Sequence, residues 1–303
     1  MVEDTLRRRD SASVAGRFSY RDYLLKVFMS GAVKLSVSRE HTMPVDNRLY
    51  DQEGDIWWSE DQPLSLLRTM LNPARLCFFR DELIKTMHTD LTGRRVLEVG
   101  CGGGLLAEEV AHLGLLLTGV DLSQRALVTA CRHAARSDLR INYVAGAGEL
   151  LPIASASHDF VICCDVLEHV DAPDRVISEA ARVLKPNGVF FYDTINRTLV
   201  SKMVVITLFQ EWRVTSCAPQ NLHDWNRFIK PNELLDMMAQ HGLQSRMLRG
   251  MRPGANPISL ICNMRKCRLG VISYGELGRR MRMCVTGDLS IAYMGWAVKS
   301  STR

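Results

Sequence analysis

The most constraining feature of this sequence is a short apolar run that leads directly into a glycine-rich turn. Residues 96–104 read Val-Leu-Glu-Val-Gly-Cys-Gly-Gly-Gly. Because they carry no side chain, Gly100, Gly102 and Gly104 let the backbone turn sharply and lie directly against a ligand. Apolar residues at helical spacing follow in residues 105–113, and Gly114 closes that segment. We therefore predict a buried strand over residues 95–99, a ligand-binding loop and a helix.

The same alternation of short apolar runs and helical stretches continues along the chain. Strands alternating with helices indicate a parallel sheet covered by helices on both faces, an α/β fold of Rossmann-like type. The further elements that we predict are strands over residues 115–120, 141–144, 160–164 and 189–192, helices over 125–136 and 174–184, and weaker strands near 244–248 and 291–298.

Two acidic residues stand where predicted strands end beside the glycine loop. Glu98 can reach a cationic ligand group through the loop, and Asp121 ends the next strand, where a carboxylate accepts hydrogen bonds from two ribose hydroxyls. A pyrophosphate binds to the backbone amides of a helix N-terminus and would be repelled by a nearby carboxylate. The acid at Glu98 therefore fits a methionine-type ammonium group better than a pyrophosphate. The spacing Gly-x-Gly-x-Gly also differs from the Gly-x-Gly-x-x-Gly of nicotinamide dehydrogenases. A plain strand–turn–helix joint is the alternative.

Further motifs identify a family resemblance that covers about residues 48–248. The loop with Glu98 and Asp121 resembles the signature of class I S-adenosylmethionine-dependent methyltransferases. The chain is also similar to the ubiquinone-pathway O-methyltransferases in Trp57-Trp58 and in four longer segments, which are Asn72-Pro73-Ala74-Arg75-Leu76, Asp165-Val166-Leu167-Glu168-His169-Val170, Asn196-Arg197-Thr198 and residues 223–231. The resemblance implies a seven-stranded sheet whose last strand is antiparallel.

The resemblance also implies a set of contacts to S-adenosyl-L-methionine. Arg75 would bind the methionine carboxylate through two hydrogen bonds, the geometry that favours arginine; a surface arginine after Pro73 is the alternative. Relatives often have an acidic residue that accepts a hydrogen bond from the adenine amine, but this chain has Ala147 at that position. Glu149 or backbone groups would accept the hydrogen bond instead. The full set of expected cofactor contacts is Arg75, Glu98, Gly100, Gly102, Gly104, Asp121, Gly148 and Cys164.

A second group of polar residues follows the fourth strand. Asp165, Glu168 and His169 resemble the acid-x-x-Glu-His segment that binds a divalent metal in ubiquinone-pathway relatives, and oxygen-rich ligands favour Mg²⁺. Such a metal would lower the pKa of a phenol or catechol hydroxyl, with His169 or His223 relaying the proton before the oxygen attacks the sulfonium methyl. A methyltransferase turn in which His169 forms a backbone hydrogen bond is the alternative.

Composition and charge bear on the location of the chain. Nine scattered cysteines do not form a disulfide framework, so we predict reduced thiols in an intracellular protein. It would be cytoplasmic or peripheral at a membrane, and at the mitochondrial inner membrane if the chain is eukaryotic. We expect residues 1–45 to be an N-terminal extension, either a targeting segment or disordered, because its basic residues, which include Arg7, Arg8, Arg9, Arg17 and Arg21, are interrupted by acids. Residues 46–303 would form the methyltransferase domain.

Two later segments set this chain apart. Residues 199–209 are apolar but too short to span a bilayer; they form either an interfacial membrane contact, which suits a polyprenyl substrate, or a helix packed on the core. Residues 250–288 are expected to be a variable insertion that begins with a glycine-rich turn, Gly250–Gly254. Residues 246–282 hold nine basic residues and one acid, Glu276. This stretch attracts an anionic membrane or ligand, or it is simply a solvated basic surface.

We therefore expect an S-adenosylmethionine-dependent O-methyltransferase acting on a phenolic or catechol acceptor, namely a polyprenylated ubiquinone precursor. One alternative is a methyltransferase acting on another small molecule, such as a natural-product phenol or amine. Another is a non-catalytic cofactor-binding subunit of a quinone-synthesis complex. Nucleic acid is not an expected partner, because the basic stretch lacks an aromatic stacking pattern.

Overall fold

The structure is a computed structural model that describes residues 46–301 except residue 55 and residues 84–89. The expected N-terminal extension, residues 1–45, lies outside the described residues. The predicted boundary between extension and domain therefore stays a prediction.

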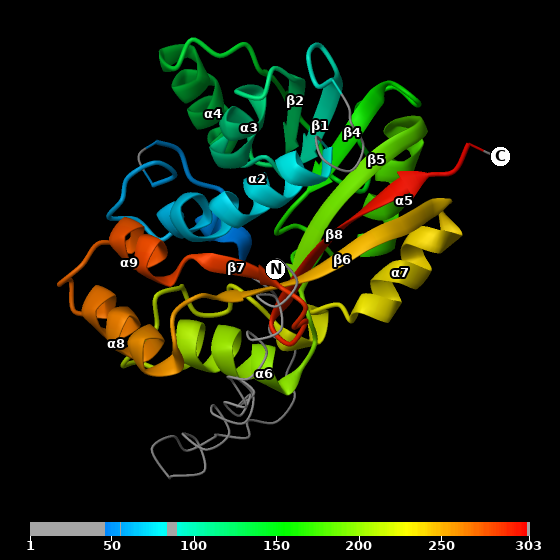
Figure 1. Cartoon of the computed structure of the whole chain (residues 1–303). Coiled ribbons are helices and arrows are strands. Elements are labelled where there is room, and N and C mark those ends of the chain that lie inside the picture. Colours follow the sequence, from blue (N-terminus) through cyan, green and yellow to red (C-terminus); the bar gives the residue numbers. More distant parts are fainter. Residues whose placement is uncertain (1–45, 55, 84–89, 302–303) are drawn as a thin grey trace, which may run out of the picture. The chain divides into compact units, whose positions relative to one another are not determined.

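A single eight-stranded sheet organises the described chain, in the order β3-β2-β1-β4-β5-β8-β6-β7 (Figure 1). Strands β1 to β5 run parallel to one another, and β8 runs antiparallel to both β5 and β6. The strands are β1 (Arg95–Val99), β2 (Leu116–Asp121), β3 (Asn142–Ala145), β4 (His158–Cys163), β5 (Leu184–Ile195), β6 (Leu243–Pro253), β7 (Met283–Thr286) and β8 (Ala292–Lys299). The predicted mostly parallel α/β sheet is confirmed, with eight strands instead of seven.

The eighth strand, β7, arises from the expected insertion. It pairs with residues 250–253, so the expected glycine-rich turn at that point is instead the end of β6. A Cβ at Gly250 would overlap the backbone carbonyl of Asp288, so this glycine allows a close backbone approach and not a turn. The rest of the insertion forms two helices, α8 (Pro257–Arg268) and α9 (Tyr274–Met281).

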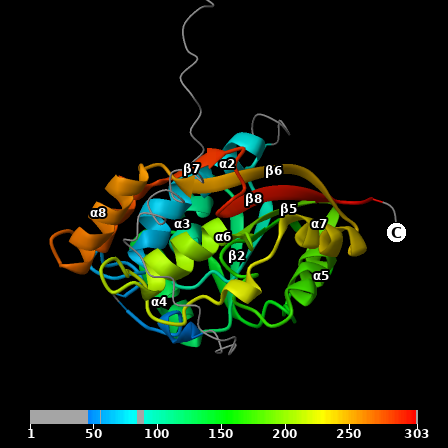
Figure 2. The ribbon, with the colours of Figure 1, turned by 90° about the horizontal axis from the view of Figure 1, so that it is seen from below.

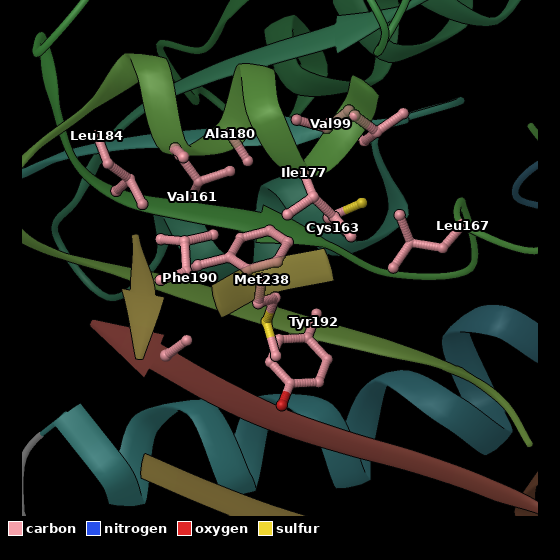
Figure 3. Close-up of a cluster of buried hydrophobic side chains, with 14 of the residues drawn as sticks. Val99, Val161, Cys163, Leu167, Ile177, Ala180, Leu184, Phe190, Tyr192 and Met238 are labelled. Carbon is pink, nitrogen blue, oxygen red and sulfur yellow. The ribbon is translucent and has the colours of Figure 1, made fainter. Parts of the chain in front are cut away.

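Helices cover both faces of the sheet, as alternate residues of β5 show. Phe190 and Tyr192 belong to the core cluster that includes Ile177 and Ala180 of α5 (Pro173–Val183). Phe191, between them, packs its ring against Phe79 of α2 (Asn72–Asp81), with ring centroids 4.2 Å apart. Because successive side chains of a strand point to opposite faces, α5 and α2 must lie on opposite sides. Figure 3 shows the α5 side of this core.

The remaining helices flank the strands. Two of them, α3 (Leu105–Ala111) and α4 (Gln124–Arg136), lie close to their predicted positions, whereas α7 (Pro231–Gln240) was not predicted. Ser123 caps α4 by accepting a hydrogen bond from the backbone N–H of Ala126, which explains why this helix begins one residue before the predicted start. Strand β5 begins earlier than predicted, because Leu184 pairs with His158 before the register shifts to Phe160 opposite Val189.

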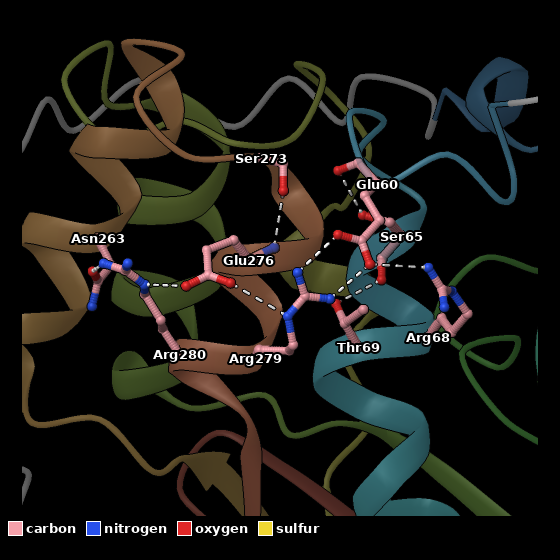
Figure 4. A network of polar contacts seen from close by, with 9 residues as sticks. All are labelled: Glu60, Ser65, Arg68, Thr69, Asn263, Ser273, Glu276, Arg279 and Arg280. Carbon is pink, nitrogen blue, oxygen red and sulfur yellow. Dashed lines mark hydrogen bonds and ion pairs between the residues drawn. The ribbon is translucent and has the colours of Figure 1, made fainter.

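Polar contacts fasten the insertion to an earlier part of the chain (Figure 4). The guanidinium of Arg279 on α9 binds both carboxylate oxygens of Glu60, at 2.7 and 2.8 Å. Arg280 donates to Glu276 at 2.8 Å, and it reaches Asn263 of α8 at 3.3 Å. A bidentate arginine–carboxylate pair fixes orientation as well as distance. The insertion is therefore a packed part of the domain and not a loose loop.

The apolar segment 199–209 lies within one helical stretch, α6 (Leu199–Ser201) followed by the π-helix η5 (Lys202–Glu211). Val204, Ile206 and Leu208 are buried, although Leu199 is 77% exposed. The packed-helix alternative therefore describes most of the segment, and lipid contact through it stays a prediction. Among the described residues, no helix is long and apolar enough to cross a membrane.

Candidate active site

The glycine loop between β1 and α3 is folded against its neighbours by its backbone. The N–H groups of Gly100 and Cys101 both donate to the carbonyl of Val120 on β2, at 2.8 and 3.1 Å. Gly102 has φ +51°, and a Cβ there would overlap the indole ring of Trp57. The loop therefore needs glycine at 102 because its conformation disfavours other residues and because Trp57 lies directly on it.

Asp121, at the end of β2, ties this loop to the next helix. Its Oδ2 accepts the N–H of Gly102 at 2.8 Å, and its Oδ1 accepts the N–H of Ser123 at 2.8 Å. Burial raises the pKa of Asp121, against the lowering effect of these backbone hydrogen bonds. Each carboxylate oxygen retains a lone pair for a further donor. Asp121 thus shapes the loop and also has acceptors left for a ligand.

A cleft with a volume of about 760 Å³ opens above the loop and the carboxyl ends of the central strands. Ligands bind at this edge in open α/β sheets. The expected cofactor residues that line it are Arg75, Glu98, Gly100, Gly102, Asp121, Gly148 and Cys164. Gly104 does not line it, because this residue lies at the start of α3, where a Cβ would approach the hydroxyl of Tyr143. The structure thus brings seven of the eight expected residues together, and gives Gly104 a packing role.

Glu98 lies in the cleft as a buried carboxyl group. Its side chain is 5% exposed, and its Oε2 has no hydrogen-bond partner in the described structure. Burial raises the pKa of Glu98 to about 8, while Arg75 opposes the shift. A buried carboxyl that lacks a partner is well placed to receive a cationic or hydrogen-bond-donating ligand group.

Arg75 is held by two carboxylates. Its Nε and Nη2 bind Asp193 at 2.5 and 3.1 Å, and Nη2 also lies 2.6 Å from Asp165. Nη1 donates to Asn72 at 3.2 Å. Burial disfavours the charged guanidinium, but Asp165 and Asp193 more than offset this and hold the pKa of Arg75 well above its ordinary value. One N–H of Nη1 is left for a ligand, so the expected two-bond grip on a carboxylate would require an ion pair to open.

A second, apolar cavity of about 150 Å³ adjoins the cleft. Its walls come from η5, from β7 and from the segment around residues 63–71. Tyr50, Leu67 and Asp165 line both cavities. The side chains of the insertion that take part are Met251, Pro253, Met281 and Met283. The insertion therefore forms part of a pocket beside the cleft.

Two histidines stand near the junction of the two cavities. His169 lines the cleft and His223 lines the apolar cavity, with ring centroids 5.1 Å apart. Nε2 of His169 and Nδ1 of His223 are buried without a partner among the described residues, whereas Nδ1 of His169 lies 3.2 Å from Asn47. Burial lowers the pKa of His169 to about 4 and that of His223 to about 3. Both rings are therefore neutral at pH 7.

The three expected metal ligands do not fit a metal ion in this arrangement. Asp165 is neutralised by Arg75, and Glu168 accepts a hydrogen bond from Thr194 at 2.8 Å. Burial raises the pKa of Glu168 to about 8, so this group favours the protonated form at neutral pH. Within the described part of the chain, no three His, Cys, Asp or Glu side chains gather as a set that could hold a metal. We therefore derive no step through a metal.

Two residues of the site were missed by sequence reasoning. Asp193 lies near the end of β5, in the run Phe-Phe-Tyr-Asp, and it also accepts the N–H of Asp165 at 3.0 Å. An acid that interrupts a buried apolar strand is a usable signal of a paired charge. Tyr50 packs edge-on against His169, with ring centroids 5.3 Å apart. Nothing local in the sequence distinguishes Tyr50 from other tyrosines.

Comparisons with known proteins agree with this architecture. Residues 97–192 match the family model described as a methyltransferase domain. Among solved structures, a possible histamine N-methyltransferase from Thermotoga maritima shares 18% identity, with a TM-score of 0.53 over 84% of this chain and 100% of that chain. A putative sarcosine dimethylglycine methyltransferase from Galdieria sulphuraria shares 17% identity, with a TM-score of 0.51 over 75% and 86%. At these identities the likeness supports the fold alone.

The fold, the glycine cleft and the matched domain define a class I S-adenosylmethionine-dependent methyltransferase. The ubiquinone biosynthesis O-methyltransferase of Idiomarina loihiensis is 39% identical over 64% of this chain and 77% of its own length. That of Methylocella silvestris is 36% identical over 67% and 82%. The chain therefore belongs to the ubiquinone biosynthesis O-methyltransferase family.

Proposed function

We propose that this O-methyltransferase transfers the methyl group of S-adenosylmethionine to a phenolic oxygen of a prenylated catechol, a ubiquinone precursor. One observation carries the proposal: the cleft that contains Glu98 and Asp121 shares Tyr50, Leu67 and Asp165 with an apolar cavity, and a neutral histidine lies on either side. A transferase that joins a charged cofactor to an apolar acceptor needs two such chambers that meet at the reacting atoms. The curated relatives are named for ubiquinone biosynthesis, which supports this class of acceptor.

The cofactor would occupy the cleft. Asp121 would accept the ribose hydroxyls, and Glu98 would accept the methionine ammonium. The cofactor backbone would lie against Gly100, Gly102 and Gly148, where the absence of side chains allows close approach. Arg75 would donate the remaining N–H of Nη1 to the methionine carboxylate, and Cys164 would line the wall next to it.

The acceptor ring would lie at the junction, with the first part of its tail in the apolar cavity. A cavity of about 150 Å³ suits a group of roughly the size of benzene, as engineered apolar cavities of that volume show. It therefore holds the ring or about one prenyl unit, and a longer tail must extend beyond it. The apolar lining favours a prenylated acceptor over a polar one.

His223 would act as the general base, because it faces the apolar cavity and its Nδ1 has no partner among the described residues. The imidazole takes the phenol proton, and the phenolate oxygen forms a bond to the methyl carbon. The carbon–sulfur bond breaks, and its electron pair stays on sulfur to give a neutral thioether. His169 lies beside His223 and is the alternative base. A cofactor that already carries an activated methyl group requires no enzyme nucleophile.

The test is methyl transfer to three acceptors under identical conditions: a short-tailed prenylated catechol, the tail-free catechol and the matched prenylated aniline. Mass spectrometry identifies the methylated atom. We expect O-methylation of both catechols, with a lower KM for the prenylated one, and no N-methylation. Exclusive methylation of the aniline would overturn the proposal. Repeating the assay after chelation of divalent metals tests the metal assistance that the family resemblance implies.

A further inference from the structure

Two neighbouring tryptophans, Trp57 and Trp58, contact the glycine loop, although the proposed chemistry uses neither. A Cβ at Gly103 would overlap the indole of Trp57, so this ring lies directly on the loop. The indole Nε1 of Trp58 donates a hydrogen bond to the carbonyl of Gly103 at 3.0 Å. Trp57 lines the cleft, whereas Trp58 is not among the described residues that line it. Trp58 therefore acts on the loop from outside the cleft.

The indole of Trp58 is itself held by a histidine of α4. It is stacked on the imidazole of His133, with ring centroids 3.4 Å apart and planes inclined by 3°. Nδ1 of His133 lies 2.7 Å from Oε1 of Glu108, and it carries the hydrogen because a carboxylate only accepts. Glu108 is 5% exposed, and its other oxygen accepts from the hydroxyl of Ser137 at 3.2 Å. The plane of the imidazole, and of the indole stacked on it, is thus fixed by a buried carboxyl group.

These contacts form a closed circuit that begins and ends on the glycine loop. Glu108 lies in the first turn of α3, and its N–H donates to the carbonyl of Gly104 at 3.1 Å. The members of the circuit are, in turn, Gly103, Trp58, His133, Glu108 and Gly104. The loop is therefore connected to both helices that follow it, α3 and α4.

Further contacts hold the chain before the tryptophans, coloured blue in Figures 1 and 2, against the start of α4. The hydroxyl of Ser123 donates to Asp51 at 2.7 Å. The N–H of Gly54 donates to the hydroxyl of Thr129 at 2.7 Å. Because both bonds reach α4 or its cap, they restrict where Trp58 can lie relative to that helix.

The composition of the loop makes it dependent on such outside contacts. Residues 102–104 are three consecutive glycines, and glycine loses more conformational freedom on ordering than any other residue. A loop that is not ordered in advance must be ordered when the cofactor binds, which weakens binding. The indole N–H that holds the carbonyl of Gly103 removes part of this cost beforehand.

We propose that Trp58 and His133 are positioning residues that hold the glycine loop in the conformation that binds S-adenosylmethionine. Trp58 acts directly through the carbonyl of Gly103, and His133 acts through Trp58. The role concerns the cofactor loop alone, so the inference does not rest on the proposed acceptor.

The experiment is a double-mutant cycle of Trp58→Phe and His133→Phe, with S-adenosylmethionine binding to the full chain measured by calorimetry. Phenylalanine keeps a flat ring at each position and removes the hydrogen bond. Each single variant should weaken binding by about three- to tenfold, the range expected for the loss of one hydrogen bond. The double variant should bind within about twofold of Trp58→Phe, because His133 acts through the bond that this variant has already removed.

Hydrogen exchange of the cofactor-free chain separates loop positioning from general stability. The peptide that contains residues 100–105 should exchange faster in Trp58→Phe than in the wild type, a result that stays decisive if His133→Phe fails to fold. Trp296→Phe is the matched control, because it removes an indole hydrogen bond of 2.9 Å to Glu82 from strand β8. It should leave cofactor affinity and loop exchange unchanged.

The proposal is overturned if Trp58→Phe binds the cofactor and exchanges its loop like the wild type. It is also overturned if the losses of the two single variants add in the double variant, since His133 would then act independently of Trp58. Because neither measurement contains an acceptor, failure here leaves the proposed reaction untouched.

Discussion

Replacement of Arg75 by methionine should cost far more stability than the loss of an ordinary ion pair. Arg75 is 6% exposed and Asp193 is 1% exposed, and Nε and Oδ2 are 2.5 Å apart. Removing the guanidinium leaves Asp193 buried without its countercharge and leaves Asp165 without its partner. Loss of one member of a buried pair typically costs about 3–5 kcal/mol. Against a usual total of about 5–15 kcal/mol, this is a large part of the free energy of unfolding.

The loss should grow with pH. Burial already raises the pKa of Asp193, and Arg75 opposes that effect. Without Arg75 the folded-state pKa rises further above the unfolded value. A carboxyl group whose pKa is higher in the folded state than in the unfolded state stabilises the folded state fully below the unfolded-state pKa. This stabilisation is lost as the pH rises through the folded-state pKa. The difference between Arg75→Met and the wild type should therefore be larger at pH 8 than at pH 5.

Urea denaturation followed by circular dichroism measures both effects. Arg132→Met is the matched control, because Arg132 lies 2.5 Å from Glu53 but is 63% exposed. An exposed pair of that kind contributes less than about 1 kcal/mol. Adding Asp193→Asn to Arg75→Met should restore part of the stability, because the unpaired charge is removed. Equal losses for Arg75→Met and Arg132→Met would refute the argument from burial.

Four further predictions concern the cleft and the base. Asp121→Asn should weaken S-adenosylmethionine binding by about 10–100-fold, since hydrogen bonds to a charged group contribute about 1.5–3 kcal/mol; unchanged affinity in calorimetry would exclude Asp121 as a ribose ligand. Gly102→Ala should abolish cofactor binding, because its Cβ would overlap Trp57, and near-normal calorimetric binding would show that the loop adapts. His223→Gln should lower kcat by about 10²–10⁴-fold with cofactor affinity retained, and a normal kcat would exclude it as the base. In the wild type, the depressed pKa of His223 predicts that its stabilising contribution is complete above pH 6.5 and is lost as pH falls through about 3, which urea titrations across this range will show.

The parts of the site that could be predicted are those encoded by neighbouring residues. The strand, glycine loop and helix over residues 95–111 follow from local periodicity and from glycines that a tight backbone turn requires. Asp121 was predictable because it ends the strand that follows the glycine loop, and sequence spacing from the loop locates that end. Sequence alone predicts that Gly104 contacts the ligand, because it does not reveal that the missing side chain makes room for Tyr143.

The parts that could not be predicted depend on residues far apart in sequence. Arg75 and Asp193 are separated by 118 positions, so the ion pair that restrains Arg75 leaves no local pattern. The predicted metal set of Asp165, Glu168 and His169 finds no support for the same reason, because the partner of Asp165, Arg75, comes from the distant helix α2. Strand β7 is only four residues long and forms because β6 extends past β8, which is a tertiary effect.

The central claim is that a neutral histidine at the junction of two cavities deprotonates a phenol for methyl transfer. The most direct measurement is transfer of a labelled methyl group from S-adenosylmethionine to a short-tailed prenylated catechol, after chelation of divalent metals, by the wild type and by His223→Gln. We predict O-methyl product from the chelated wild type and a strong loss in the variant at normal cofactor binding. Cofactor binding by the wild type without any methylated catechol, with or without added Mg²⁺, would contradict the account.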